Sequence, residues 1–177
     1  VATVVVLSFL ALYYSGNKLV TKSDSSKLAK PVAIALMISI GIGLHNFGEG
    51  LAIGASVGMG SIAFSTFLIV GFALHNTTEG IAIAAPMSRG KLMIGKLVAL
   101  GLIAGSPAIF GAWIGGFAYS PFSSVVFLAV GAGAIFQVIL VLLKWIKDEG
   151  DKTLSSAAVI CGFAVGMSIM YLTSIFV

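Results

Sequence analysis

Long runs of apolar residues alternate with short polar segments along this chain. The apolar runs cover residues 32–58, 61–86, 92–118, 122–146 and 154–177, and residues 1–14 form the end of another. A helix needs about 20 apolar residues to cross the hydrocarbon core of a bilayer, so the pattern predicts six spanning segments. Their connections are short, which favours antiparallel neighbours in one domain. We therefore expect an all-α fold, a polytopic bundle of membrane helices over residues 1–177.

Residues 15–30 are the one long polar stretch, rich in Ser, Lys, Asn and Asp. Such a composition predicts a flexible connector, and Pro31 suits the first turn of the helix that follows. The chain begins at Val1, inside an apolar run. We therefore expect that the start of at least one helix is missing from this sequence.

Composition supports a membrane protein. The chain has 177 residues, of which 59% are apolar and 9% are charged, and its mean hydropathy is +1.13. Soluble domains have about 25% charged residues. The net charge of +4 does not indicate a nucleic-acid partner, because the basic residues are confined to loops. The single cysteine, Cys161, lies within the last apolar run, which excludes an internal disulfide and a cysteine-cluster zinc site.

Basic residues occupy alternate loops. The loops at 57–61 and 118–122 carry no charge, whereas all ten basic residues lie in or beside the other three loops. The positive-inside rule places such loops in the cytosol. This predicts a multi-pass protein of the cell membrane with a non-cytosolic C-terminus. The basic residues are Lys18, Lys22, Lys27, Lys30, Arg89, Lys91, Lys96, Lys144, Lys147 and Lys152.

Glycines recur at four-residue spacing within the apolar runs. Small residues at this spacing let membrane helices approach closely, so we expect these positions to form helix contacts. They are Gly50, Gly54 and Gly58, Gly101 and Gly105, Gly111 and Gly115, and Gly162 and Gly166.

One phrase occurs twice. Residues 41–55 and 71–85 match at nine of fifteen positions, and both copies contain His-Asn-x-x-Glu-Gly. The two helices cross the membrane in opposite directions, so equal phrases at equal depth would be related by a pseudo-two-fold axis in the membrane plane. Inverted symmetry around a midplane site is common in transporters.

The repeated phrase places ionisable side chains in an apolar environment. Residues four apart share a helix face, so His45 lies with Glu49 and His75 lies with Glu79. Ionisable residues inside a membrane segment indicate a functional site. Two imidazoles and two carboxylates suit a divalent cation, Zn²⁺ above all, with Fe²⁺, Mn²⁺ or Cd²⁺ as alternatives. The same pairs would also serve as hydrogen-bonded contacts between helices, but their duplication at matched depth favours the metal.

Asn46 and Asn76 follow the two histidines, about 100° around each helix. Their side chains offer carbonyl ligands to the metal or hydrogen bonds that orient the carboxylates. The predicted metal-binding set is therefore His45, Asn46, Glu49, His75, Asn76 and Glu79.

With these residues, the chain resembles the ZIP family of divalent metal transporters. That family has an eight-helix fold with His-Asn-x-Pro-Glu-Gly on its fourth helix and a related motif on its fifth. The double use of His-Asn-x-x-Glu-Gly is most similar to the GufA-like branch. The resemblance covers essentially the whole chain as the third to eighth helices. It implies that His45, Glu49, His75 and Glu79 are the primary ligands, and that Asn46 and Asn76 flank a second metal in two-metal members.

The chain departs from the family pattern at several positions. Gly48 and Thr78 stand where proline is common, which implies softer kinks. Many members have an acidic residue where Asn76 stands and a Glu before the proline of the sixth helix, where this chain has Ser106 before Pro107. These losses favour a single metal ion.

We therefore expect a transporter, and not an enzyme, that moves a divalent metal across the lipid bilayer into the cytosol. One alternative is a membrane-embedded zinc enzyme, although the His-Glu-x-x-His motif of many proteases is absent. Another is a proton-coupled carrier that uses His and Glu without metal. A homodimer is compatible with the sequence.

Overall fold

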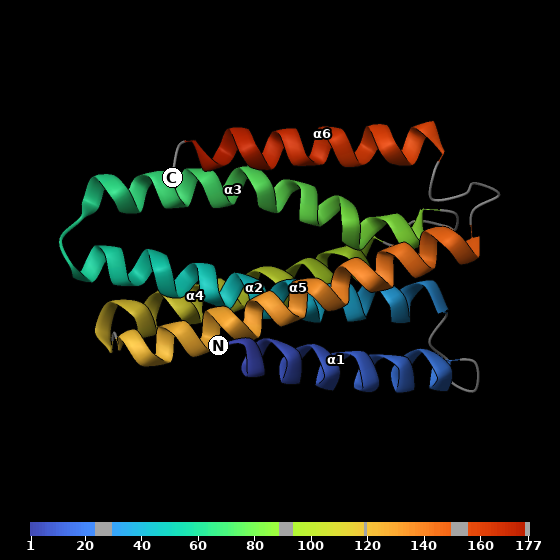
Figure 1. The fold of residues 1–177 in the computed structure, drawn as a ribbon, viewed down its shortest axis with the longest axis horizontal. Coiled ribbons are helices and arrows are strands. Elements are labelled where there is room, and N and C mark those ends of the chain that lie inside the picture. The colour runs from blue at the N-terminus through green and yellow to red at the C-terminus, as the bar shows by residue number, and fades with distance from the viewer. Residues whose placement is uncertain (24–29, 89–93, 119, 150–155, 176–177) are drawn as a thin grey trace.

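The computed structural model describes residues 1–23, 30–88, 94–118, 120–149 and 156–175. These residues form an all-helical bundle in which successive helices run in opposite directions (Figure 1). The all-α prediction is confirmed. The elements are α1 (Ala2–Ser23), α2 (Lys30–Gly58), α3 (Ile62–Ala84), the 3-10 turn η1 (Ala85–Met87), α4 (Ile94–Phe117), α5 (Pro121–Glu149) and α6 (Ala157–Ser174).

Helices α1 to α5 are each long and apolar enough to cross a membrane. The described apolar segment of α6, Ala157–Leu172, is shorter. Large apolar side chains cover the outside of the bundle, and Phe117, Phe122 and Phe163 are each more than 70% exposed. A bilayer solvates such a surface and water does not, so the molecule is consistent with a multi-pass membrane protein.

Helix α2 is the centre of the bundle and packs against α1, α3, α4 and α5. Its core contacts are made by isoleucines such as Ile38 and Ile42, which are fully or almost fully buried. Helix α6 packs only on α3 among the principal contacts between described helices, and Figure 1 shows these two at one side of the bundle. The candidate site residues of α2 therefore lie on the best-packed helix.

Glycine contacts bring α2 and α4 unusually close together. A Cβ added at Gly50 would lie 2.0 Å from the backbone oxygen of Ala108, and one added at Gly54 would lie 2.0 Å from that of Ala112. Gly111 and Gly115 make the reciprocal approach from α4. The close contacts predicted at these positions are confirmed.

For two other glycine pairs, the described residues show no such contact. A Cβ added at Gly101, Gly105, Gly162 or Gly166 would meet no described atom within 4 Å. These glycines lie on faces of α4 and α6 that no other described helix covers. Spacing alone identifies a smooth helix face, but not whether a partner packs on it.

The first helix is longer than predicted. It continues to Ser23, whereas the sequence predicts a flexible connector over residues 15–30. The polar residues bond within the helix, since Ser15 Oγ donates to Leu12 O and Thr21 Oγ1 donates to Asn17 O. Gly16 is buried against Met37 of α2, so its lack of a side chain lets α1 and α2 pack closely. Residues 24–29 of the predicted connector lie outside the described residues.

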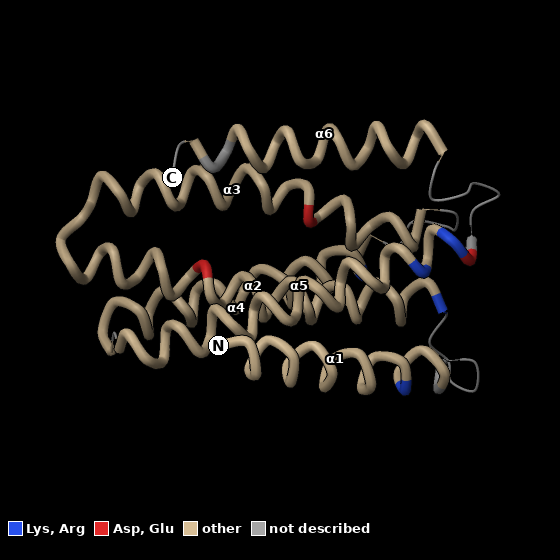
Figure 2. Tube along the Cα trace, in the orientation of Figure 1, with Lys and Arg blue, Asp and Glu red and all other residues tan. Residues whose placement is uncertain are grey.

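The basic residues that the structure describes gather at one end of the bundle (Figure 2). This end contains the C-terminal ends of α1, α3 and α5 and the starts of α2, α4 and α6. The prediction that the basic segments share one end is therefore confirmed for these residues. Lys27, Arg89, Lys91 and Lys152 lie outside the described residues.

Candidate metal centre

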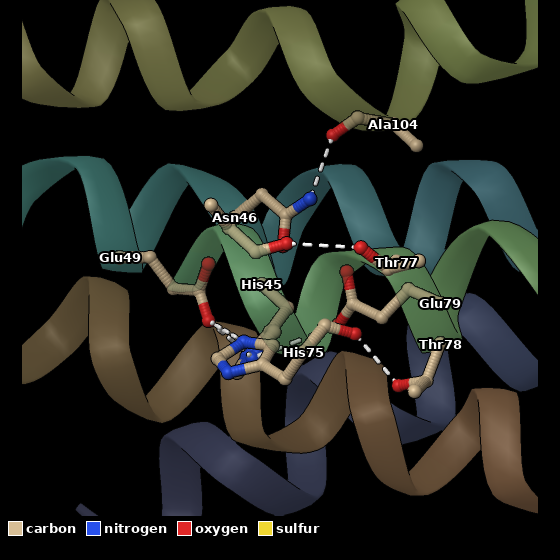
Figure 3. A network of polar contacts seen from close by, with 9 residues as sticks. His45, Asn46, Glu49, His75, Thr77, Thr78, Glu79 and Ala104 are labelled. Atoms are coloured by element: carbon tan, nitrogen blue, oxygen red, sulfur yellow. Dashed lines mark hydrogen bonds and ion pairs between the residues drawn. The ribbon is translucent and has the colours of Figure 1, made fainter. Parts of the chain in front are cut away.

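The two copies of the repeated phrase meet where α2 packs on α3. His45 and Glu49 extend from α2, and His75 and Glu79 extend from α3 toward the same point (Figure 3). Glu49 Oε1 lies 3.3 Å from His45 Nε2 and 2.5 Å from His75 Nε2. Glu79 Oε1 lies 4.0 Å from His45 Nε2. One oxygen of Glu49 therefore bridges two imidazoles that belong to different helices.

The spacing of these atoms is close to that of a metal site. One ligand atom each from His45, Glu49 and His75 lies within 4.8 Å of the other two. Two ligand atoms of a tetrahedral zinc ion, each bound at 2.0–2.2 Å, are about 3.3–3.6 Å apart. The three side chains would therefore reach a common ion after movements of about 1 Å. Glu79 lies beside this group and offers a fourth ligand.

Four buried oxygen atoms of the cluster have no hydrogen-bond partner among the described residues. They are Glu49 Oε2, Glu79 Oε2, Asn46 Oδ1 and Asn76 Oδ1. All four are acceptors, and a buried acceptor without a partner is costly. A cation would interact favourably with such a group of oxygens, and the negative charge of two ionised carboxylates would balance a divalent ion.

The two copies differ in their surroundings. His75 is only 7% exposed, and Phe72 packs edge-on against its ring with the centroids 5.5 Å apart. The side chain of His45 is 32% exposed, although α5 passes close to its backbone at Gly131, where an added Cβ would lie 3.2 Å from His45 Cα. The repeated sequence thus gives similar ligands but unequal access to them.

Asn46 is fixed by the neighbouring helix α4. Its Nδ2 donates a hydrogen bond of 3.1 Å to the backbone oxygen of Ala104, and the residue is 3% exposed. Pro107 lies inside α4 and lacks the N–H group that would bond to Ile103 O. The backbone oxygens of this turn are therefore directed in part toward α2, where Gly43 lies against Ile103 O. Of the two predicted asparagines, Asn46 has this anchor, whereas Asn76 is only half-buried.

Both helices run unbroken through the positions where the resembled family commonly has proline. Gly48 lies within α2, and Thr78 lies within α3. Thr78 Oγ1 donates a hydrogen bond of 2.6 Å to His75 O, which ties the hydroxyl to the backbone of the histidine. The substitution of proline by Gly48 and Thr78 therefore leaves regular helix on both sides of the cluster.

Gln137 of α5 is a further buried polar residue, and it lies outside the repeated phrase. This residue is 2% exposed, and its Oε1 has no hydrogen-bond partner among the described residues. A Cβ added at Gly41 would lie 3.1 Å from that oxygen, and Gly41 is one turn before His45. A lone glutamine in an apolar run was the only available signal.

Comparison of the chain with protein-family models, with curated proteins and with solved structures finds no match.

Proposed function

We propose that this chain transports a divalent metal ion, with Zn²⁺ as the preferred substrate, through the cluster formed by His45, Glu49, His75 and Glu79. The observation that carries the proposal is the approach of three ligand atoms within 4.8 Å on two helices that are long enough to span a membrane. Two imidazoles and two carboxylates match the ligands that Zn²⁺ takes in proteins. The resemblance of the repeated phrase to the ZIP family supports the same substrate.

The division of the ligands between two helices suggests how an ion would be released. Helix α2 is tightly packed: 61% of the residues in its 18-residue apolar segment are buried, compared with 22% in that of α3. Gly80, one residue after Glu79, has no described atom near an added Cβ, so no described residue packs closely against α3 at this position. A displacement of α3 relative to α2 would separate His75 and Glu79 from His45 and Glu49 and open the site.

The proposed direction of transport is toward the cytosol. The lysines at one end of the bundle support a cytosolic position for that end, because cytosolic loops carry an excess of basic residues. In this scheme a hydrated ion enters from the opposite end, where the loops carry no charge. It exchanges water for the four side chains, and it leaves toward the lysine-rich end by the alternating access that repeat-based transporters use.

The proposal is tested by zinc uptake into proteoliposomes that contain the full chain and an enclosed zinc-sensitive dye. Glu49→Ala and Glu79→Ala are each expected to reduce uptake to the level of empty liposomes, because each removes a charged ligand. Glu149→Ala is the matched control, since it removes the same side chain at the end of α5. Undiminished uptake in both cluster variants would contradict the proposal. Zinc binding without uptake would favour a metalloenzyme, and proton flux without zinc would favour the proton-coupled carrier.

A further inference from the structure

A cavity of about 240 Å³ lies between α1, α2 and α5, near the basic end of the bundle. Its volume is that of several water molecules. The polar residues that line it come from all three helices. They are Asn17 and Thr21 of α1, Lys30 of α2, and Lys144, Trp145 and Asp148 of α5.

Hydrogen-bond donors dominate the charged and aromatic lining of this cavity. Lys30 and Lys144 each carry an ammonium group, which donates and cannot accept. Trp145 Nε1 is buried and has no hydrogen-bond partner among the described residues, and an indole N–H is a donor only. Trp145 therefore places an indole in the wall of the cavity, beside the two lysines.

The charges also favour an anion. Two ammonium groups face one carboxylate, and neither lysine forms an ion pair with Asp148 within 4 Å in the described structure. Among the described side chains, neither lysine therefore has an ion-pair partner within 4 Å. A phosphate group offers several acceptor oxygens and a negative charge to such donors.

We propose that this cavity binds a phosphate group, held by Lys30 and Lys144, with the indole of Trp145 in the wall beside it. The source that fits its position is the headgroup of an anionic lipid. The cavity lies at the lysine-rich end of helices that span the bilayer, and basic pockets between membrane helices at this depth bind anionic headgroups. Free inorganic phosphate has the same chemistry, and the experiment separates the two sources. The site is distinct from the His and Glu cluster and does not depend on metal transport.

Trp145 provides the readout. The chain has two tryptophans, so Trp113→Phe leaves Trp145 as the only indole. This variant of the full chain is placed in phosphatidylcholine bilayers that contain brominated phosphatidylglycerol or, at the same mole fraction, brominated phosphatidylcholine. Bromine quenches a nearby indole. The site predicts stronger quenching by the anionic lipid, and Lys30→Gln or Lys144→Gln should each lower that preference about fivefold.

Lys147→Gln is the matched control, because it removes the same charge from the same helix at a position that does not line the cavity. It should leave the lipid preference unchanged. In bilayers of phosphatidylcholine alone, a saturable change of Trp145 emission with inorganic phosphate that requires Lys30 and Lys144 would support the site with a soluble ligand. Equal quenching by the two lipids without a response to phosphate would overturn the proposal. An equal loss of preference in Lys147→Gln would also overturn it.

Discussion

The close contact of α2 with α4 predicts that the same substitution, glycine to alanine, will have different effects on stability at two positions. In Gly54→Ala the added Cβ would lie 2.0 Å from Ala112 O and 2.7 Å from Gly116 N. Both are backbone atoms, so no side-chain rotation relieves the overlap. In Gly105→Ala the added Cβ meets no described atom within 4 Å. Both glycines lie within helices that are long and apolar enough to span a membrane, which makes Gly105→Ala the matched control.

The magnitude follows from the overlap. Ordinary contact begins at 3.4 Å, so a contact of 2.0 Å requires the helices to separate by about 1.4 Å. A gap of 0.5–1 Å already removes a quarter to a half of the dispersion attraction between facing atoms, and overpacking costs about 1–3 kcal/mol. Replacing a helical glycine by alanine returns at most about 1 kcal/mol. We therefore expect Gly54→Ala to destabilise the fold by about 1–2 kcal/mol, and Gly105→Ala to be neutral or slightly stabilising.

Thermal unfolding of the full chain in detergent, followed by size-exclusion chromatography of the remaining folded fraction, measures this difference. For a chain of this length, 1 kcal/mol corresponds to about 2–4 °C in Tm. Gly54→Ala should therefore melt several degrees below the wild type, whereas Gly105→Ala should not. Equal Tm values for the two variants would refute the packing argument, because they would show that α4 does not lie against Gly54.

Two further substitutions test contacts around the cluster, each by the same melting assay. Asn46→Ala removes the hydrogen bond to Ala104 O and should lower the free energy of unfolding by about 0.5–1.5 kcal/mol. Asn76→Ala should lower it by less. A larger loss of stability in Asn76→Ala would show that Asn46 is not anchored by α4. Ser56→Ala removes a buried 2.8 Å hydrogen bond between Ser56 and Ser65, which joins α2 to α3, and should cost about 0.6 kcal/mol. Thr66→Ala is its control, since Thr66 is exposed and bonds within its own helix, and equal losses in the two variants would argue against the contact.

Much of the fold could be predicted because apolar run length and helix period are local properties. The runs locate the helices to within a few residues, except that α1 extends to Ser23. Gly16 and Thr21 are residue types that are common in loops, which is why the sequence predicts a connector there. In the structure, Gly16 packs against Met37, and Thr21 donates a hydrogen bond to the backbone oxygen of Asn17. These contacts form only when α1 packs on α2 and the backbone is helical, so they could not be predicted from composition.

The candidate site was predictable for a similar reason. Spacing of four residues puts His45 with Glu49 and His75 with Glu79, and antiparallel neighbours bring the pairs together. The different surroundings of the two copies of the phrase could not be predicted, since they depend on which helices pack around each copy. Helix α4 anchors Asn46, and α5 passes the backbone of His45 at Gly131.

The central claim is that the cluster holds one divalent ion, and zinc binding to the purified full chain tests it most directly. Equilibrium dialysis followed by metal analysis should give one Zn²⁺ per chain. X-ray absorption should show only nitrogen and oxygen ligands at about 2.0–2.2 Å, with the signature of imidazole. Binding should be lost in the double variant His45→Ala, His75→Ala. Retention of the same zinc content in that variant, or sulfur ligation in the wild type, would contradict the account.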